Sequence, residues 1–170
     1  MADRLLLHAS EFVISCGTVT FDLKEAKVLL IRCRTNNECM LPKGRKNVGE
    51  TLEETALRET WEETGYEATL LALRNRTQAT SPSVSDLMSL INTEPIYMSQ
   101  RNSDGMFKII FWYVATGDST VDEQQRPQQP NEDFETKWTP CDEAEAALTF
   151  DDDRQTFRTA WLAVKTAASV

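Results

Sequence analysis

Histidine is nearly absent from this chain. His8 is the only one in 170 residues, and it lies close to the N-terminus, where chains are commonly mobile. A Ser-His-Asp triad, a Cys-His pair and a His-ligated zinc site all need a histidine inside a folded pocket. We therefore expect any catalysis here to depend on carboxylates and a metal ion.

Long hydrophobic runs are also missing. The first ten residues contain only a run of three leucines, which is too short for the apolar region of a signal peptide. No later segment approaches the roughly 20 apolar residues that span a membrane. The sequence as given therefore predicts a cytoplasmic protein without a membrane span. The prediction applies to the sequence as given, and a secretion leader removed from it would change the expected location.

Cysteine is sparse, and its spacing matches neither a metal site nor a redox pair. We expect reduced and partly buried thiols, as in cytosolic proteins. The length is typical of one domain, and a hydrophobic content of 41% is ordinary for a protein with a buried core. The four cysteines are Cys16, Cys33, Cys39 and Cys141.

Strand and helix patterns alternate along the chain, which predicts an α/β domain. Thr51 and Glu54 form a T-x-x-E capping box at the start of a helix that Gly65 ends. A second, amphipathic helix is expected over 151–168. Strands are expected over 11–21, 27–34, 39–42, 67–76, 94–100, 106–116 and 134–138, with one helical turn at 86–90 in a long loop.

Three carboxylates of the first predicted helix share one face. Glu59, Glu62 and Glu63 stand at i, i+3 and i+4, a spacing that brings side chains together on a helix. Like charges this close repel, and a divalent cation would remove the penalty. Hard oxygen ligands suit Mg²⁺ or Mn²⁺, and the glycine loop at Gly44 lets a backbone carbonyl approach the same ion. The alternative is an ordinary solvated helix rich in glutamate.

The stretch that contains these glutamates, GRKNVGETLEETALRETWEETGY, resembles the Nudix hydrolase box. That box reads G, five residues, E, seven residues and R-E-U-x-E-E-x-G-U, where U is aliphatic or bulky and apolar. One position departs, because Thr60 stands where an apolar residue is expected, and we expect only a small loss of packing. The positions that fit are Gly44, Glu50, Arg58, Glu59, Glu62, Glu63, Gly65 and Tyr66.

The resemblance implies a fold. Nudix domains are α/β/α sandwiches in which a central mixed sheet lies between helices, and the box forms a loop–helix–loop metal site. The resemblance extends over about 12–164, so we expect 1–170 to form a single Nudix hydrolase domain. We also expect a monomer.

The resemblance further implies roles for the box residues. Glu59 and Glu63, with Glu62 and the backbone at Gly44, would hold Mg²⁺ or Mn²⁺. Within the catalytic set, Glu62 is the first candidate for the base and Glu59 the second. Arg58 is expected to pair with Glu50 and to brace the loop against the helix. By the same resemblance, a further metal-facing carboxylate outside the box would be Glu132, with Glu135 second. The alternative is that Glu132 and Glu135 are both solvated loop acids.

Net charge is −9, but the charge is unevenly distributed. Between positions 31 and 46, five basic residues and one acid give +4 beside the predicted metal loop. Such a cluster is suited to holding several phosphates, although solubilising surface charge is the alternative. The acidity of the whole chain argues against broad nucleic-acid binding. The expected substrate-binding residues are Arg32, Arg34, Lys43, Arg45, Lys46 and, further along the chain, Lys108.

Within the Nudix family, the sequence LPKGR and the box are most similar to two groups. One cleaves diadenosine polyphosphates, and the other, the diphosphoinositol polyphosphate phosphohydrolases, often cleaves both these and inositol pyrophosphates. The resemblance implies metal-dependent attack of water on phosphorus in such a small, phosphate-dense molecule. Three alternatives stay open: mRNA decapping, hydrolysis of another nucleoside diphosphate linked to a group X, and a Nudix-like module that binds a nucleotide without turnover.

Overall fold

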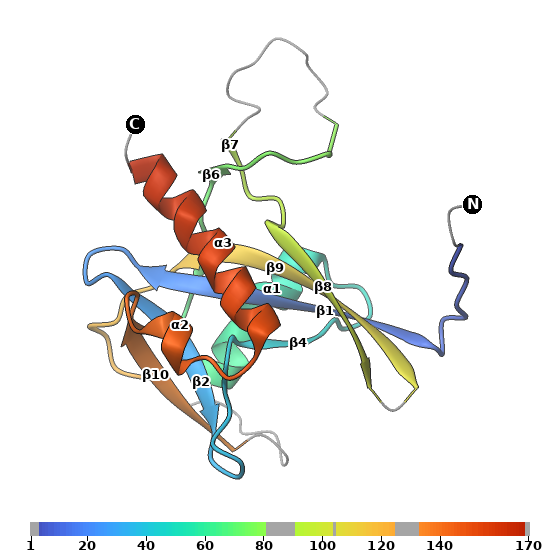
Figure 1. Ribbon diagram of the computed structural model, residues 1–170, viewed down its shortest axis with the longest axis horizontal. Coiled ribbons are helices and arrows are strands. Elements are labelled where there is room, and N and C mark those ends of the chain that lie inside the picture. The colour runs from blue at the N-terminus through green and yellow to red at the C-terminus, as the bar shows by residue number, and fades with distance from the viewer. Residues whose placement is uncertain (1–3, 81–90, 104, 125–132, 169–170) are drawn as a thin grey trace.

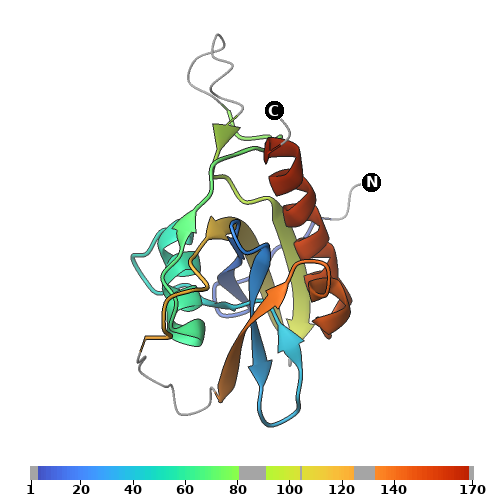
Figure 2. The same cartoon turned by 90° about the vertical axis from the view of Figure 1, so that its left-hand side faces the viewer.

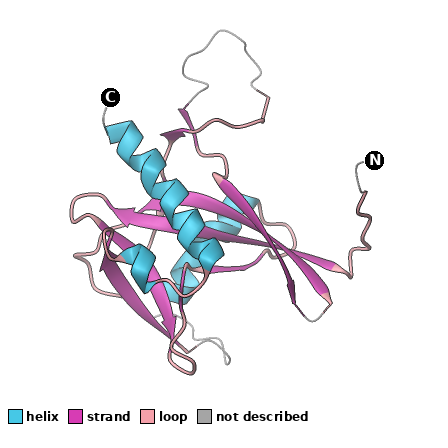
Figure 3. Cartoon of the chain, viewed as in Figure 1, coloured by secondary structure: helices cyan, strands magenta, loops and turns pink. Residues whose placement is uncertain are grey.

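The computed structural model describes residues 4–80, 91–103, 105–124 and 133–168, coloured along the chain in Figure 1 and by secondary structure in Figure 3. Among the described residues, no helix is long and apolar enough to cross a membrane. The elements are β1 (Phe12–Asp22), β2 (Lys27–Cys33), β3 (Cys39–Met40), β4 (Lys43–Arg45), α1 (Leu52–Thr64), β5 (Thr69–Leu70), β6 (Leu73–Arg74), β7 (Ile91–Asn92), β8 (Tyr97–Ser103), β9 (Met106–Thr116), β10 (Phe134–Pro140), α2 (Ala144–Ala147) and α3 (Asp151–Ala168).

The main sheet is mixed and is built around β1. Strand β9 runs parallel to β1 over ten residue pairs, from Phe12 opposite Phe107 to Phe21 opposite Thr116. The order along the sheet is β10-β2-β1-β9-β5, while β3 pairs with β2, β4 with β1 and β8 with β9. A parallel pair needs a crossover connection. The chain between β1 and β9 supplies it, and this connection carries α1.

The sheet separates two helical layers. Figure 2 shows α1 on one side of the strands and α3 on the other, so the molecule is an α/β/α sandwich. Successive strand residues point to opposite faces. On β1, Thr18 contacts α1 through a hydroxyl–hydroxyl hydrogen bond to Thr60, whereas Val19 and Phe21 belong to the core beneath α3.

The face covered by α3 is the apolar core. Phe157 and Val164 of α3 pack with Phe21, Trp112 and other buried side chains from the strands. The ring of Phe21 stacks on that of Trp161, with centroids 5.3 Å apart. Burial of aromatic and aliphatic side chains is the main favourable term in folding. This face therefore holds the larger of the two apolar clusters of the domain.

Helix α1 forms where its capping signals predict it. Thr51 accepts a hydrogen bond from the Glu54 N–H, and Glu54 accepts one from the Thr51 N–H, so the capping box is complete. Gly65 ends the helix with φ 74°, a left-handed conformation that favours glycine. The expected helix over 151–168 also forms with those bounds.

Several features of the fold differ from the sequence-based expectation. The strand expected over 67–76 is two short strands: β5 joins the main sheet and β6 pairs with β7 in a separate ribbon. The break lies where Leu71 and Leu73 turn into the core beneath α3. The short elements β4, β7 and α2 were not predicted, because each is too short to show a period, and the strand expected over 94–100 is found as β8 at Tyr97–Ser103. The turn expected at 86–90 lies outside the described residues.

Candidate active site

Helix α1 turns a polar stripe toward the sheet. Glu59 and Glu63 are each only 5% exposed, and Thr60 between them is fully buried. Glu62 lies at the margin of this stripe, with 21% of its side chain exposed. Two carboxylates one helical turn apart are costly to bury unless something neutralises them. The buried pair is therefore the first structural sign of a cation site.

Strand β4 presents its outer backbone edge to these carboxylates. The Thr18 N–H donates to the Pro42 carbonyl, and the Lys46 N–H donates to that of Ile14. In an antiparallel pair, such bonds alternate along the strands, so the N–H and C=O groups of Lys43 and Arg45 point away from β1. The Lys43 N–H donates to Glu63 over 2.6 Å.

Gly44 faces α1 at a point where no side chain fits. A Cβ atom there would lie 1.9 Å from Oε2 of Glu59. Glycine is therefore required for the close approach of β4 and α1. By the same alternation, the Gly44 carbonyl points toward β1 and that of Lys43 toward the outer edge. This geometry favours a steric role for Gly44 in the site.

Arg58 ties the box together. Its Nε donates to Glu50 over 2.6 Å, and its Nη1 donates to Glu59 over 2.7 Å and to Glu62 over 2.8 Å. Its Nη2 donates to Glu50 and to the carbonyl of Arg45. These contacts use all five guanidinium N–H groups, and the ion pairs raise the pKa of Arg58 further above its usual value. The bracing contact expected between Arg58 and Glu50 is present.

Glu50 fixes the loop ahead of the helix. The Arg58 guanidinium lowers the pKa of Glu50 to about 2, against a smaller opposing effect of burial, and the Asn47 N–H and Thr55 hydroxyl add to the lowering. Asn47 donates its backbone N–H over 2.9 Å, and Thr55 donates its hydroxyl over 2.9 Å. A charged Glu50 thus holds the loop and the first turns of α1 in one arrangement.

The donor set fits a divalent cation. Glu59, Glu62 and Glu63 offer only carboxylate oxygens, which Mg²⁺ and Mn²⁺ prefer, and the space over Gly44 is filled by one of them. Among the described residues, no three acidic, histidine or cysteine side chains already converge on one point. Their hydrogen bonds show why: Glu59 and Glu62 accept from Arg58, and Glu63 accepts the Lys43 N–H. Binding would require these carboxylates to turn.

Of the two acids expected outside the box, only Glu135 lies among the described residues. Glu132 lies outside the described residues. Glu135 on β10 is exposed and lies next to Thr136, whose hydroxyl donates to the Thr64 carbonyl at the end of α1. Because neighbouring strand residues alternate in direction, Glu135 points away from α1. The structure therefore does not bring Glu135 to the box.

Three of the expected phosphate-binding cations lie on the other face of the same strands. Lys43 and Arg45 are paired with Gly17 and Ser15 of β1, so their side chains share the α3-side face. Lys108 on β9 shares it two residues before the core residue Ile110. Burial lowers the pKa of Lys108, and repulsion from Lys43, Arg45 and the unpredicted Arg101 adds to this. We call these four side chains the basic group.

The other three expected cations lie apart from the basic group. Lys46 follows β4 on the side of α1, near Cys16, and its Nζ donates to the Asn47 carbonyl over 3.0 Å. Arg34 pairs with Asp133 over 3.2 Å at an exposed position. Arg32 on β2 lies opposite Cys39 and Glu135. Position along the sequence thus did not predict position on the sheet.

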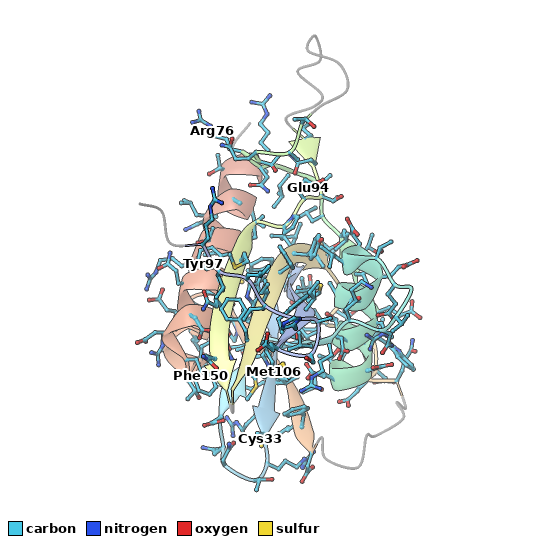
Figure 4. The ribbon with its side chains drawn as sticks, turned by 90° about the vertical axis from the view of Figure 1, so that its right-hand side faces the viewer. Cys33, Arg76, Glu94, Tyr97, Met106 and Phe150 are labelled. Atoms are coloured by element: carbon cyan, nitrogen blue, oxygen red, sulfur yellow. The ribbon has the colours of Figure 1, made fainter. Side chains whose placement is uncertain are left out.

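Arg101 was missed because its partners are far away in sequence. Its guanidinium contacts Asp152 over 2.6 Å and Asp153 over 3.1 Å and lies 5.5 Å from the ring centroid of Phe150. Phe150 is labelled beside the end of α3 in Figure 4. The contact therefore joins β8 to the N-terminal end of α3. Ion pairs over about 50 residues leave no local signal in a single sequence.

Comparison with known families assigns the domain to a family. The NUDIX domain model matches residues 12–160. The chain belongs to the Nudix family. The expected α/β Nudix fold is thereby confirmed, and the chain is a pyrophosphohydrolase of this family.

Solved structures share the fold at low sequence identity. An Ap4A hydrolase binary complex from C. elegans is 17% identical with a TM-score of 0.63, covering 91% of this chain and 98% of that one. A Nudix-family hydrolase from Clostridium perfringens is 22% identical with a TM-score of 0.58, covering 92% and 97%. A Nudix hydrolase from Nitrosomonas europaea is 16% identical with a TM-score of 0.58, covering 88% of each chain.

Proposed function

We propose that this Nudix hydrolase cleaves a phosphoanhydride bond in a small, phosphate-dense molecule by attack of water on phosphorus. The substrate classes are a diphosphoinositol polyphosphate, a diadenosine polyphosphate, or both. One observation carries the proposal: the three-residue strand β4 has buried carboxylates packed against it on the α1 side and the basic group on the opposite face. A phosphate chain crossing the edge of β4 would therefore meet a cation-binding site and a basic surface in succession.

Glu59 and Glu63 are the proposed principal ligands of Mg²⁺ or Mn²⁺, with Glu62 completing the set. When bound, the ion supplies neutralisation of phosphate charge and increased acidity of water. Gly44 provides the room in which Glu59 reaches β4. The outer edge of β4 also presents the Lys43 carbonyl, which is the main-chain oxygen best directed toward this set. A contribution of Glu132 stays a prediction.

Glu62 is the proposed general base, and Glu59 is the second candidate. The side chain of Glu62 is 21% exposed, whereas that of Glu59 is 7% exposed, so a water molecule reaches Glu62 more readily. Arg58 bonds to both and keeps them oriented. Because its five N–H groups already have acceptors, Arg58 acts as a positioning residue rather than as a direct phosphate ligand.

The basic group is the proposed phosphate-binding surface. Partial burial of Lys108 beside the three other cations of the basic group is unfavourable without an anion, and several phosphates would relieve it. Among the proteins sharing the fold, one is named an Ap4A hydrolase, which agrees with a diadenosine polyphosphate. Lys46, Arg32 and Arg34 are proposed only as outer contacts for longer substrates.

A substrate panel tests the proposal. Diadenosine tetra-, penta- and hexaphosphate, an inositol pyrophosphate, capped RNA and ADP-ribose would each be incubated with the purified protein and Mg²⁺ or Mn²⁺, and the products would be resolved by chromatography. We expect cleavage of at least one of the first two classes with a higher kcat/KM than for capped RNA or ADP-ribose. Preferred cleavage of capped RNA or ADP-ribose would contradict the substrate class, and binding without turnover would contradict catalysis.

A further inference from the structure

Asp153 in the first turn of α3 is a completely buried carboxylate. Its exposed fraction is 0%, and it lies on the opposite side of the sheet from α1. Its Oδ2 accepts the Leu41 N–H over 3.3 Å, and its Oδ1 accepts an Nη2 hydrogen of Arg101 over 3.1 Å. A buried charge with these two partners is conspicuous beside the apolar core beneath α3.

Asp153 accepts the N–H of Leu41, which lies three residues before Gly44, the first residue of the box. Leu41 is followed by Pro42, whose carbonyl accepts the Thr18 N–H of β1, and then by Lys43, whose N–H donates to Glu63. Three consecutive residues are thus tied in turn to α3, to the central strand and to a carboxylate of α1. A shift at Leu41 would move the Lys43 N–H, and with it the carboxylate that it orients.

Asp153 also faces the basic group. Burial raises its pKa, and Arg101 and Lys43 oppose that effect, so these cations favour its charged form. Arg101 has a second acid partner, Asp152, whose side chain is 36% exposed, whereas the Leu41 N–H donates to Asp153. The two neighbouring aspartates therefore share Arg101, and only Asp153 reaches the strand that enters the box.

We propose that Asp153 is a positioning residue that orders the Leu41–Lys43 segment from α3 and thereby sets the geometry of the metal-binding carboxylates on the opposite face. This inference rests on the proposed function. Outer partners that orient ligands typically change metal affinity by about 10–100-fold when removed. A purely structural role at the start of α3 would alter stability and leave metal affinity unchanged.

The test compares Asp153→Asn and Asp153→Ala with the matched control Asp152→Asn in the full-length protein. Mn²⁺ binding without substrate would be measured by calorimetry, and hydrogen exchange would be followed for the backbone amides of Leu41 and Lys43. We expect Asp153→Ala to weaken Mn²⁺ binding by about 10-fold or more and to speed exchange at both amides. Asp153→Asn keeps an acceptor for Leu41 and should show a smaller change, and Asp152→Asn should match the wild type.

The outcomes separate this inference from the proposed function. If the wild type binds Mn²⁺ and hydrolyses substrate while the Asp153 variants match Asp152→Asn in Mn²⁺ affinity, the positioning role is wrong and the proposed function stands. If the wild type neither binds Mn²⁺ nor turns over any substrate, the proposed function itself fails. Should Asp153→Ala not fold, Asp153→Asn carries the test, and Mn²⁺ affinity and Leu41 exchange that both match Asp152→Asn in that folded variant would overturn the inference.

Discussion

The two faces of the central sheet are packed by different chemistry. On the α3 side, Phe157 and Val164 meet Phe21 and other apolar side chains. On the α1 side, the helix buries threonines and glutamates, and its small apolar cluster is centred on Ala56 beside Cys16 and Tyr113. The two faces therefore have different roles. The α3 side is packed for stability, whereas the α1 side buries carboxylates, which packing alone would disfavour.

The comparison between the two faces is tested first at Glu62, the proposed base on the α1 side. Glu62→Gln should lower kcat by about 10²–10⁴, the range for loss of general-base catalysis, because the amide cannot accept the proton. Steady-state kinetics at saturating Mg²⁺ would show it, and metal affinity should change less than in a Glu63→Gln variant. If Glu59→Gln spares metal binding and Glu62→Gln destroys it, the roles assigned to Glu59 and Glu62 are exchanged.

The opposite result is expected on the α3 face. Phe157→Ala should cost about 3–5 kcal/mol of unfolding free energy, because it removes a buried ring and leaves a cavity. Hydrolysis per folded molecule should stay near the wild-type value at a temperature where the variant is folded. Denaturant unfolding and an activity assay on the same sample would check both. A large loss of kcat in the folded variant would show that the two faces are not separable.

The basic group is the proposed phosphate-binding surface, and it lies on the face of the sheet opposite the carboxylates of α1. Replacing Arg45 and Lys108 together by glutamine should lower kcat/KM for phosphate-dense substrates by tens-fold or more, because each charge-assisted contact is worth about 1.5–3 kcal/mol. The effect should shrink as salt rises. Arg76→Gln is the matched control, since Figure 4 shows Arg76 at the far end of the molecule from Met106 at the start of β9. Equal and small losses for all substrates, including ADP-ribose, would assign the group to ordinary surface charge.

Asp22 is a buried carboxylate that lies outside the proposed metal site, and it offers a comparison with the carboxylates of α1. Burial alone would raise the pKa of Asp22, but N–H bonds from Ser119, Glu25 and Lys24 outweigh it and hold the pKa at about 2. A lowered pKa stabilises the fold above the unfolded value of 3.8, and this stabilisation is lost as pH falls toward 2.

Asp22→Asn should therefore be less stable than the wild type at pH 7, by on the order of 2 kcal/mol. The difference should disappear as the pH approaches 2. Urea unfolding across this range would measure it, with the exposed Asp142→Asn as control. A stability difference that is the same at pH 2 and pH 7 would mean that the hydrogen bonds do not depend on the charge of Asp22.

The sequence predicts the elements that have strong local signals. The box, the capping of α1 and the bounds of β9 and α3 all follow from residue patterns. Hydrophobicity alone does not identify the buried side of α1, because Leu57 and Trp61 are only partly buried while Thr60 is buried. Its hydroxyl bonds to Thr18 and to the Ala56 carbonyl, so the departure from the box has a matching partner on β1.

Features that depend on pairing across the sheet could not be predicted. The register of β4 decides that Lys43 and Arg45 face away from α1, and no local pattern in a three-residue strand fixes that register. The contacts of Arg101 with α3 likewise arise only when β8 and α3 meet in the fold. The sequence therefore indicated the chemistry of Lys43 and Arg45 but not their arrangement, and Arg101 carried no local signal at all.

The most direct test of the division between the faces is one variant measured twice. Glu63→Gln keeps an acceptor for the Lys43 N–H, while it removes one of two buried charges on α1. Hydrolysis at saturating Mg²⁺ and metal-free unfolding free energy would be compared with those of the wild type and of Glu67→Gln, an exposed acid just beyond α1. We expect nearly abolished turnover with little loss of stability. Turnover within a few-fold of wild type, or a stability loss like that of a core variant, would contradict it.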